Sequence, residues 1–285
     1  MELRYTSPRE GRLSAILRED MKVSAGLMNR LKWQDLIFVN GIPRHTDYPV
    51  APGDLVTIPL DEPDPEYPPE DGELTVLFED DHILAVDKAP GILIHPSRSR
   101  LTGTLANRVY GYYRRTGQKS AFHPMTRLDR DTYGIVLLAK NSHVHSLLQA
   151  GPMRKTYHAL VFGGPTEDRG TIDAPIARKP LPSLLREVRA DGKPSVTEFE
   201  VLERKEKLCK LALRPITGRT HQLRVHCAYM GFPILGDPQY GSEASKAYSD
   251  RLGLTYQRLC AASLEFPHPI TGELMILRSQ MDAAL

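Results

Sequence analysis

Residues 61–73, DEPDPEYPPEDGE, divide the chain into two parts, and this division limits the folds that the sequence can adopt. Proline and acidic residues dominate the segment, so it cannot supply a hydrophobic core and we expect an extended linker. Its negative charge would also keep it away from a polyanion. The sequence therefore predicts a small module over residues 1–60, a linker over 61–73 and a large domain over 74–285.

The small module has the pattern of two short helices followed by a hairpin. Apolar residues recur at helical spacing in 13–17 and 27–31, and Asn40-Gly41 lies between apolar runs, which is a strong hairpin signal. Two helices followed by VNG and PGD resemble the S4-type RNA-binding module. This resemblance implies that Arg30 and Lys32 present positive charge to phosphates. The alternative is a small α+β cap with a solvated basic edge.

The large domain shows short strands separated by turns and a few helices. Residues 197–201 and 209–213 alternate apolar with polar side chains, which predicts an antiparallel hairpin with one buried face. We find no βαβ alternation and no internal repeat, so the predicted fold class is α+β, with a mainly antiparallel mixed sheet flanked by helices. The loop over 87–100 carries Arg98 and Arg100, which are candidate RNA contacts unless they are ordinary solvated loop charges.

Charge and cysteine content narrow the setting in which the protein works. The net charge of +2 is too mild to prove a nucleic-acid partner, because balanced charges can still be sorted onto different faces. Cys209, Cys227 and Cys260 form neither a CxxC motif nor an even framework, which indicates buried thiols in a reducing compartment. No apolar run approaches the length of a membrane span. With no heptad or extended apolar seam, we expect a cytoplasmic monomer that does not contact a membrane.

The stretch MTRLDRDTYG, residues 125–134, is the first candidate for a functional site. It places Arg127, Asp129 and two further charged residues directly before the apolar run 135–139. A carboxylate pressed against a buried strand must be paired or hydrogen-bonded, or its pKa shifts. The alternative is a solvated turn that leads into a strand.

Most other chemistries lack support in the sequence. An HxH pair near residue 143 has no partner ligands at a helical offset, and the chain has no GxxxxGK[ST], GxGxxG or GxSxG motif. Cys227 falls on the apolar side of a predicted helix, where core packing is the better explanation. What remains is Asp129 as nucleophile or general base, with Arg219 as a candidate partner and Tyr157 as a ring that could stack on a base. Spacing alone does not show that these three residues meet.

Four segments in order resemble those of the RluA-type pseudouridine synthases, which convert uridine to pseudouridine in ribosomal or transfer RNA. The segments are TRLDRDTYGIVLLAK, RKTYHALVFG, GRTHQLRVH and SLEFPHPITGE. The resemblance covers nearly the whole chain, from the S4-like start to the last strand. It implies the pseudouridine synthase fold, an RNA substrate and a reaction that needs no cofactor or metal.

The resemblance also assigns roles to individual residues. Asp129 corresponds to the catalytic aspartate, and Tyr157 to the ring that packs on the target base. Arg219 would pair with Asp129 and keep it charged, and Leu264 would line the base pocket. Arg127 corresponds to the arginine that fills the gap left by the flipped nucleotide.

Two departures and three alternatives accompany this hypothesis. The family usually has His where this chain has Thr126, and Ser where it has Tyr133, and these departures concern the identity of the RNA more than the chemistry. Ribosomal RNA is the expected substrate, and transfer RNA is the alternative. The chain could also be an RNA-binding protein that has lost catalysis, or a hydrolase in which Asp131 is a second acid.

Overall fold

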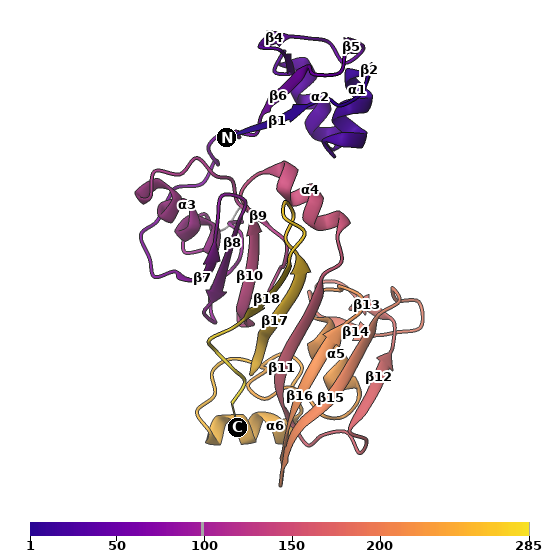
Figure 1. The fold of residues 1–285 in the computed structure, drawn as a ribbon. Coiled ribbons are helices and arrows are strands. Elements are labelled where there is room, and N and C mark those ends of the chain that lie inside the picture. Colours follow the sequence, from indigo (N-terminus) through magenta and orange to yellow (C-terminus); the bar gives the residue numbers. More distant parts are fainter. Residues whose placement is uncertain (98–99, 285) are drawn as a thin grey trace.

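The computed structural model of the chain describes residues 1–97 and 100–284 (Figure 1). Residues 1–60 fold around a core of their own, in which Leu13, Leu27 and Val56 are buried. Strand β6 (Leu55–Pro59) lies between β1 (Glu2–Thr6) and β3 (Phe38–Val39), and β3 pairs with β4 (Ile42–Pro43) around the Asn40-Gly41 turn. The remaining elements of this part are β2 (Gly11–Arg12), α1 (Leu13–Ala15), the π-helical turn η1 (Ile16–Asp20), α2 (Ala25–Trp33) and β5 (Pro49–Val50).

The large domain is built on one mixed sheet. Its strand order in the described part of the chain is β12-β15-β16-β11-β17-β10-β8-β7, with β18 on β17 and β9 on β10. Every pairing in it is antiparallel except that of β10 with β17. This arrangement confirms the predicted α+β class with a mainly antiparallel sheet. The strands are β7 (Thr75–Glu79), β8 (Ile83–Lys88), β9 (His123–Pro124), β10 (Tyr133–Ala139), β11 (Arg154–Phe162), β12 (Arg169–Asp173), β15 (Val196–Lys205), β16 (Leu208–Pro215), β17 (Leu259–Pro267) and β18 (Leu274–Arg278).

Helices cover both faces of this sheet. Strand β10 is buried on both sides, so its successive side chains enter two different cores. Val136 and Leu138 pack with α3 (Leu105–Arg115), whereas Ile135 and Leu137 pack with α4 (Ser142–Ala150). Farther along the sheet, α5 (Gln222–Tyr229) contributes to a third core, and α6 (Glu243–Arg251) lies near the C-terminus (Figure 1).

A short parallel seam joins the two halves of the sheet. Strands β10 and β17 pair at Tyr133–Cys260 and Gly134–Ala261. Gly134 has φ of 102°, and a Cβ atom placed there would lie 2.5 Å from the Ala261 carbonyl oxygen. Only glycine combines this backbone conformation with so close an approach. The seam is therefore held together at a position that tolerates no side chain.

The segment over 61–73 packs along the large domain. Asn107 on α3 donates from Nδ2 to the Pro68 carbonyl at 2.8 Å, and its own carbonyl accepts from the Glu70 amide at 3.0 Å. The Glu70 carboxylate accepts from the Gly103 amide at 2.8 Å. Nearer the N-terminal module, Glu62 accepts from the amide of Ser142 at 2.7 Å, at the start of α4. The segment is thus docked at both of its ends.

The sequence over 164–194 predicts a basic loop or a mobile hairpin, and the structure has a small hairpin there. Strands β13 (Ile176–Arg178) and β14 (Arg186–Val188) pair antiparallel beside the main sheet. None of the helices in the described ranges has both the length and the apolar character that crossing a bilayer requires. Cys209, Cys227 and Cys260 are buried and form no disulfide.

Candidate active site

The loop before β10 carries Asp129 at the N-terminal end of that strand. The Met125 amide donates to the Leu137 carbonyl at 2.8 Å, and the Thr132 amide donates to the Asp129 carbonyl at 3.2 Å. Between these bonds, Leu128 is 8% exposed and anchors the loop in the core beneath it. Because Leu128 points into the core, its neighbour Asp129 is left at the surface, where its side chain is 27% exposed.

Lys88 fixes the backbone of this loop through hydrogen bonds from its side chain. Lys88 is 1% exposed, and its ammonium group donates to the carbonyls of Ala89, Ile92 and Arg130 at 3.0, 2.9 and 2.9 Å. Burial lowers the pKa of Lys88 to about 8, while the charges of Asp131 and Asp129 act in the opposite direction. Lys88 therefore ties the end of β8 to the backbone next to Asp129.

Arg224, and not Arg219, is the partner of Asp129. Arg224 Nη1 donates to Asp129 Oδ2 at 3.0 Å. The predicted pairing with Arg219 is wrong, because Arg219 precedes α5 in an exposed turn and its Nε donates to the Pro194 carbonyl at 3.2 Å. Arg224 instead lies within the first turn of α5, on its buried side. The positive end of the helix adds to the attraction for the carboxylate.

A second carboxylate fixes the orientation of Arg224. Asp237 is fully buried and accepts from Nε at 2.7 Å and from Nη2 at 2.9 Å, a bidentate arrangement. The Gln239 side chain accepts from Nη2 at 2.8 Å, and the Tyr240 ring centre lies 4.9 Å from the guanidinium carbon. Burial alone would lower the pKa of Arg224, but the bonds and charges of Asp237 and Asp129 raise it. The guanidinium is therefore a rigid, permanently charged support for Asp129.

His221 approaches Asp129 from the same side, and the sequence analysis did not identify it. Its Nε2 lies 3.8 Å from Asp129 Oδ1, and its Nδ1 lies 2.8 Å from Tyr240 Oη. Tyr240 Oη also accepts from the Arg186 amide at 2.9 Å, so its own hydrogen is free to be donated to Nδ1. Nε2 then carries the ring hydrogen and directs it toward Asp129. Burial lowers the pKa of His221 and favours this neutral form, while Asp129 opposes the shift.

Tyr157 lies close enough to Asp129 to feel its charge. It lies on β11 and is partly buried, in contact with the core that contains Leu128 and with the core that contains Leu223 of α5. Burial raises the pKa of Tyr157, and the nearby charge of Asp129 raises it further. The structure therefore brings Tyr157 and Asp129 together, with the ring of Tyr157 uncharged at neutral pH.

Leu264 does not line this site, and the prediction that it would is wrong. Its side chain is 2% exposed and packs with Val144 and Leu148 of α4. Tyr157 packs on the other face of the sheet, with the α3 core. Alternate residues of a strand point to opposite faces, so a residue chosen from its position along the strand can fall on the wrong side.

The remaining predicted residues surround the site or lie farther away. Arg127 is exposed, two residues before Asp129, and Arg100 is exposed as well. Arg98 lies outside the described residues. On the N-terminal module, Lys32 is exposed and Arg30 is partly exposed, near the end of α2.

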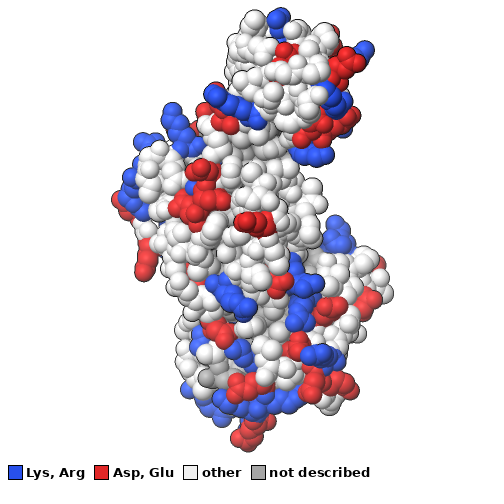
Figure 2. Space-filling model, in the orientation of Figure 1, with Lys and Arg blue, Asp and Glu red and all other residues white. Residues whose placement is uncertain are grey.

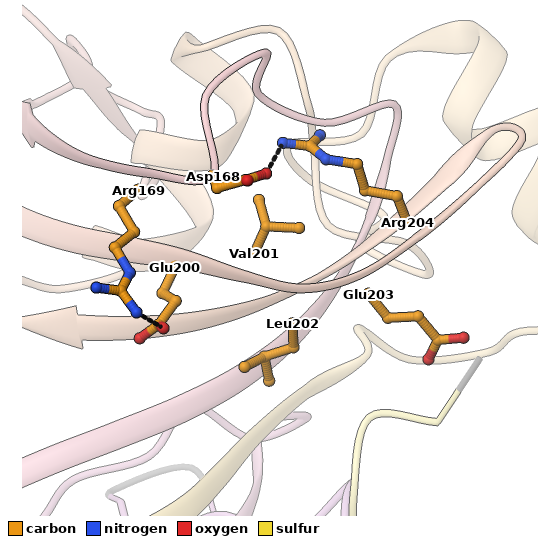
Figure 3. A pocket seen from close by; sticks show the side chains of 7 residues that line it. All are labelled: Asp168, Arg169, Glu200, Val201, Leu202, Glu203 and Arg204. Carbon is orange, nitrogen blue, oxygen red and sulfur yellow. Dashed lines mark hydrogen bonds and ion pairs between the residues drawn. The ribbon is translucent and has the colours of Figure 1, made fainter.

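An open depression elsewhere on the surface does not belong to this site (Figure 3). It lies where β12 and β15 pair, and two ion pairs involve four of its charged side chains. Arg169 pairs with Glu200 at 2.6 Å, and Arg204 pairs with Asp168 at 2.9 Å. In the described ranges we find no cluster of His, Cys, Asp and Glu side chains arranged to hold a metal ion. The constellation around Asp129 is the stronger candidate for chemistry.

Comparisons with known proteins agree with the geometry. The family described as RNA pseudouridylate synthase matches residues 82–229. The chain is 37% identical over 243 residues to the uncharacterized RNA pseudouridine synthase YjbO of Bacillus subtilis (strain 168), which covers 83% of each protein. It is 31% identical over 289 residues to the ribosomal large subunit pseudouridine synthase C of Vibrio parahaemolyticus, covering 96% of this chain and 90% of that protein.

A solved structure extends the agreement to the fold. The human RNA pseudouridylate synthase domain containing 1 superimposes with a TM-score of 0.61 and 27% identity, over 76% of this chain and 87% of that one. The family match includes Asp129, Tyr157 and Arg224. The chain therefore belongs to the RluA-type RNA pseudouridine synthases and is an isomerase of uridine in RNA.

Proposed function

We propose that Asp129 is the catalytic residue of this isomerase and that large-subunit ribosomal RNA is its substrate. The observation that supports the first part is the bond from Arg224 to Asp129 Oδ2 at 3.0 Å. A carboxylate held in this way is oriented before substrate arrives, which is what a nucleophile or general base requires.

The reaction needs one bond broken and one bond formed on the same nucleotide. The N1–C1′ bond of uridine breaks, the uracil turns, and C5 bonds to C1′. C5 then loses its hydrogen as a proton and N1 gains one, so no electrons are exchanged with an outside partner. Asp129 can attack the sugar or the base, or it can accept the C5 proton, and each of these roles uses an ionised carboxylate.

The other residues of the site bind and position. A uridine within folded RNA must leave its stack to reach Asp129, at a cost of a few kcal/mol. The ring of Tyr157 can offset part of this cost by stacking on the uracil. Arg127 is exposed two residues before Asp129 and would fill the gap that the flipped nucleotide leaves in the RNA. Arg219 and Arg100 are exposed cations on the surrounding loops and suit contacts with phosphates.

The choice of large-subunit ribosomal RNA draws on relatives and on the N-terminal module. Several relatives are named as ribosomal large subunit pseudouridine synthases C or D. We infer that residues 1–60 form an S4-like RNA-binding module, in which Arg30 and Lys32 contact phosphates. Trp33, next to them at the end of α2, is 84% exposed and could stack on a base. Basic side chains occur both on this module and on the catalytic domain in the view of Figure 2, as contacts at two places on one RNA would require.

The test uses large-subunit ribosomal RNA transcribed in vitro with uridine tritiated at C5. Because C5 loses its hydrogen, each pseudouridine formed releases one tritium to water. We expect release by the wild-type protein and none by Asp129→Asn. Asp131→Asn is the matched control, since Asp131 binds Arg130 at 2.8 Å and should be dispensable.

Each other outcome identifies a different error. Loss of activity in Asp131→Asn as complete as in Asp129→Asn would contradict a single catalytic carboxylate. Release from unmodified transfer RNA but not from ribosomal RNA would leave the role of Asp129 intact and correct the substrate.

The setting of the enzyme completes the proposal. The three buried thiols suit a reducing compartment, so we infer that the enzyme is cytoplasmic. We also infer that it acts as a monomer, since its sequence has no heptad or extended apolar seam. Elution from a sizing column at a mass of about twice 32.0 kDa would contradict the monomer.

A further inference from the structure

Tyr240 contacts both of the side chains that flank Asp129. The guanidinium of Arg224 lies over its ring, with 4.9 Å between the guanidinium carbon and the ring centre. Its hydroxyl oxygen lies 2.8 Å from His221 Nδ1. Its amide donates to Asp237 Oδ1 at 3.1 Å, so the carboxylate that orients Arg224 also fixes the backbone of Tyr240. One residue thus connects the arginine and the histidine that lie next to the catalytic carboxylate.

The two carboxylate oxygens of Asp129 are held unequally. Arg224 binds Oδ2 at 3.0 Å, whereas within residues 1–97 and 100–284 no group donates a hydrogen bond to Oδ1. His221 Nε2 lies 3.8 Å from Oδ1, which is too far for a hydrogen bond but close enough to form one when the site tightens around substrate. The protonation of His221 therefore decides whether Oδ1 meets a hydrogen or a lone pair.

The bonds of the Tyr240 hydroxyl determine which nitrogen of His221 carries the hydrogen. The Arg186 amide can only donate, so Tyr240 Oη is the acceptor in their contact at 2.9 Å. The hydroxyl hydrogen is then directed to His221 Nδ1, which accepts it with a lone pair, and the ring hydrogen resides on Nε2. In the opposite tautomer, a lone pair on Nε2 would face the Asp129 carboxylate and be repelled by it.

The Arg186 amide keeps its place because its hairpin is attached to α5. Strand β14 lies beside α5 (Figure 1). Val188 of β14 packs against the core to which α5 contributes, and His226 Nε2 of α5 lies 2.9 Å from the Ala174 carbonyl, just before β13. His221 directly precedes the same helix, with φ of 58° in the left-handed region that few residues other than glycine adopt. The Tyr240 hydroxyl therefore lies between two backbone positions that are fixed relative to each other.

We propose that Tyr240 is a positioning residue for the isomerisation, whose hydroxyl holds His221 with its Nε2 hydrogen directed at Asp129 Oδ1. The proposal rests on the proposed function for the catalytic role of Asp129. The Nε2 hydrogen restrains the oxygen that Arg224 leaves free, so that Asp129 meets the flipped uridine in one orientation. In this role Tyr240 acts through His221 and makes no bond to the nucleotide.

The first test detects the hydrogen on the ring of His221 directly. Protein that contains nitrogen-15-labelled histidine gives NMR signals that distinguish a protonated ring nitrogen from one with a lone pair, and the signals of His221 are those missing from His221→Asn. At pH 7.5 we expect the hydrogen on Nε2 and a hydrogen-bonded lone pair on Nδ1. In Tyr240→Phe the Nδ1 signal should move to that of a nitrogen without a hydrogen bond. Tyr229→Phe, at a side chain that is 61% exposed, is the matched control and should leave the signal unchanged.

The second test asks whether the hydroxyl acts through His221. Tyr240→Phe keeps the ring beneath Arg224 and deletes only the hydroxyl. With large-subunit ribosomal RNA tritiated at C5 as the substrate, we expect kcat to fall about three- to fivefold, as for the loss of one hydrogen bond, with KM within about twofold. In the His221→Asn background, which lacks the imidazole, the same change should alter kcat by less than about twofold.

Three results would overturn the positioning role. The first is a hydrogen on Nδ1 of His221 in the wild-type protein. The second is an unchanged kcat in Tyr240→Phe. The third is an equal loss of kcat with and without the imidazole of His221, because the hydroxyl would then support the fold and not the histidine.

Failure of the proposed function has a different signature. If Asp129→Asn releases tritium as the wild-type protein does, the catalytic assignment fails whatever the spectra show. If Asp129→Asn is inactive and Tyr240→Phe behaves like the Tyr229→Phe control, the catalytic assignment stands and only the positioning role is excluded.

Discussion

Arg224 offers the sharpest test of the site, because it binds two carboxylates with different roles. Its side chain is 5% exposed and that of Asp237 is fully buried. Arg224→Met leaves the Asp237 carboxylate buried without its partner, which costs about 3–5 kcal/mol of folding free energy. The same change deletes one charge-assisted hydrogen bond to Asp129, a loss of about 1.5–3 kcal/mol. If that bond orients the catalytic carboxylate, the loss corresponds to about 10- to 150-fold in rate.

A second substitution separates these two effects. Asp237→Asn removes the buried charge but keeps Oδ1, which accepts from the amides of Gln239 and Tyr240 at 2.9 and 3.1 Å. The double variant, Arg224→Met with Asp237→Asn, should therefore recover at least about 2 kcal/mol of the stability that Arg224→Met loses, because no uncompensated charge remains buried. Its activity should stay low, since Asp129 still has no arginine.

Urea unfolding and tritium release measure the two quantities on the same samples. Asp237→Asn alone is the control, because it removes the buried carboxylate while Arg224 is still present. Recovery of near wild-type turnover by the double variant would refute the reasoning, since activity would then depend on the stability of the fold and not on the support of Asp129.

Three further predictions follow from single side chains. Lys88 has a pKa of about 8 in the folded protein and 10.5 in the unfolded chain, so the unfolded state binds more protons between these values. The free energy of unfolding, compared with that of Lys88→Met, should therefore rise with pH by about 3 kcal/mol. Urea-unfolding stabilities of the two proteins that stay parallel from pH 7.5 to 10 would exclude this. Glu62 has a pKa of about 2, below its usual 4.5, so its stabilisation is present above pH 4.5 and is lost as the pH falls toward 2. Glu62→Gln should therefore be less stable at pH 6 by about 1–3 kcal/mol, and this difference should shrink by pH 3; a constant difference would contradict the assignment. Asn tolerates the backbone φ of 58° at position 221, but His221→Asn removes the imidazole that lies near Asp129. We expect kcat to fall about five- to tenfold with little change in melting temperature. An unchanged kcat would show that His221 does not act on Asp129.

Asp129 and Tyr157 could be singled out because the segments around them resemble those of a known family. The partner of Asp129 could not be predicted by the same reasoning, because the choice between Arg219 and Arg224 depends on where the turn ends and α5 begins. One signal was present. Arg224 lies on the same helix as Leu223 and Cys227, both of which point into the core. A buried arginine needs carboxylates, and ILGDPQYG offers Asp237 a few residues later.

Leu264 shows a different limit of the sequence. The pairing of β11 with β17 shifts register between Thr156 and Tyr157, so positions on the two strands change their relation across that point. A shift of one residue transfers a side chain to the opposite face. The sequence marks Leu264 as buried but does not say which of two cores receives it. His221 was missed for a related reason, since its role depends on Tyr240 and on the hairpin that supplies Arg186.

The parallel seam between β10 and β17 divides the candidate site between the two halves of the sheet. Asp129 is carried by the half of the sheet that holds β8 and β10, whereas Tyr157 and Arg224 are carried by the half that holds β11 and α5. A small rotation about the seam would part the carboxylate from its cation while each half kept its own core. An RNA that contacts both halves of the sheet would therefore hold Asp129 and Arg224 together.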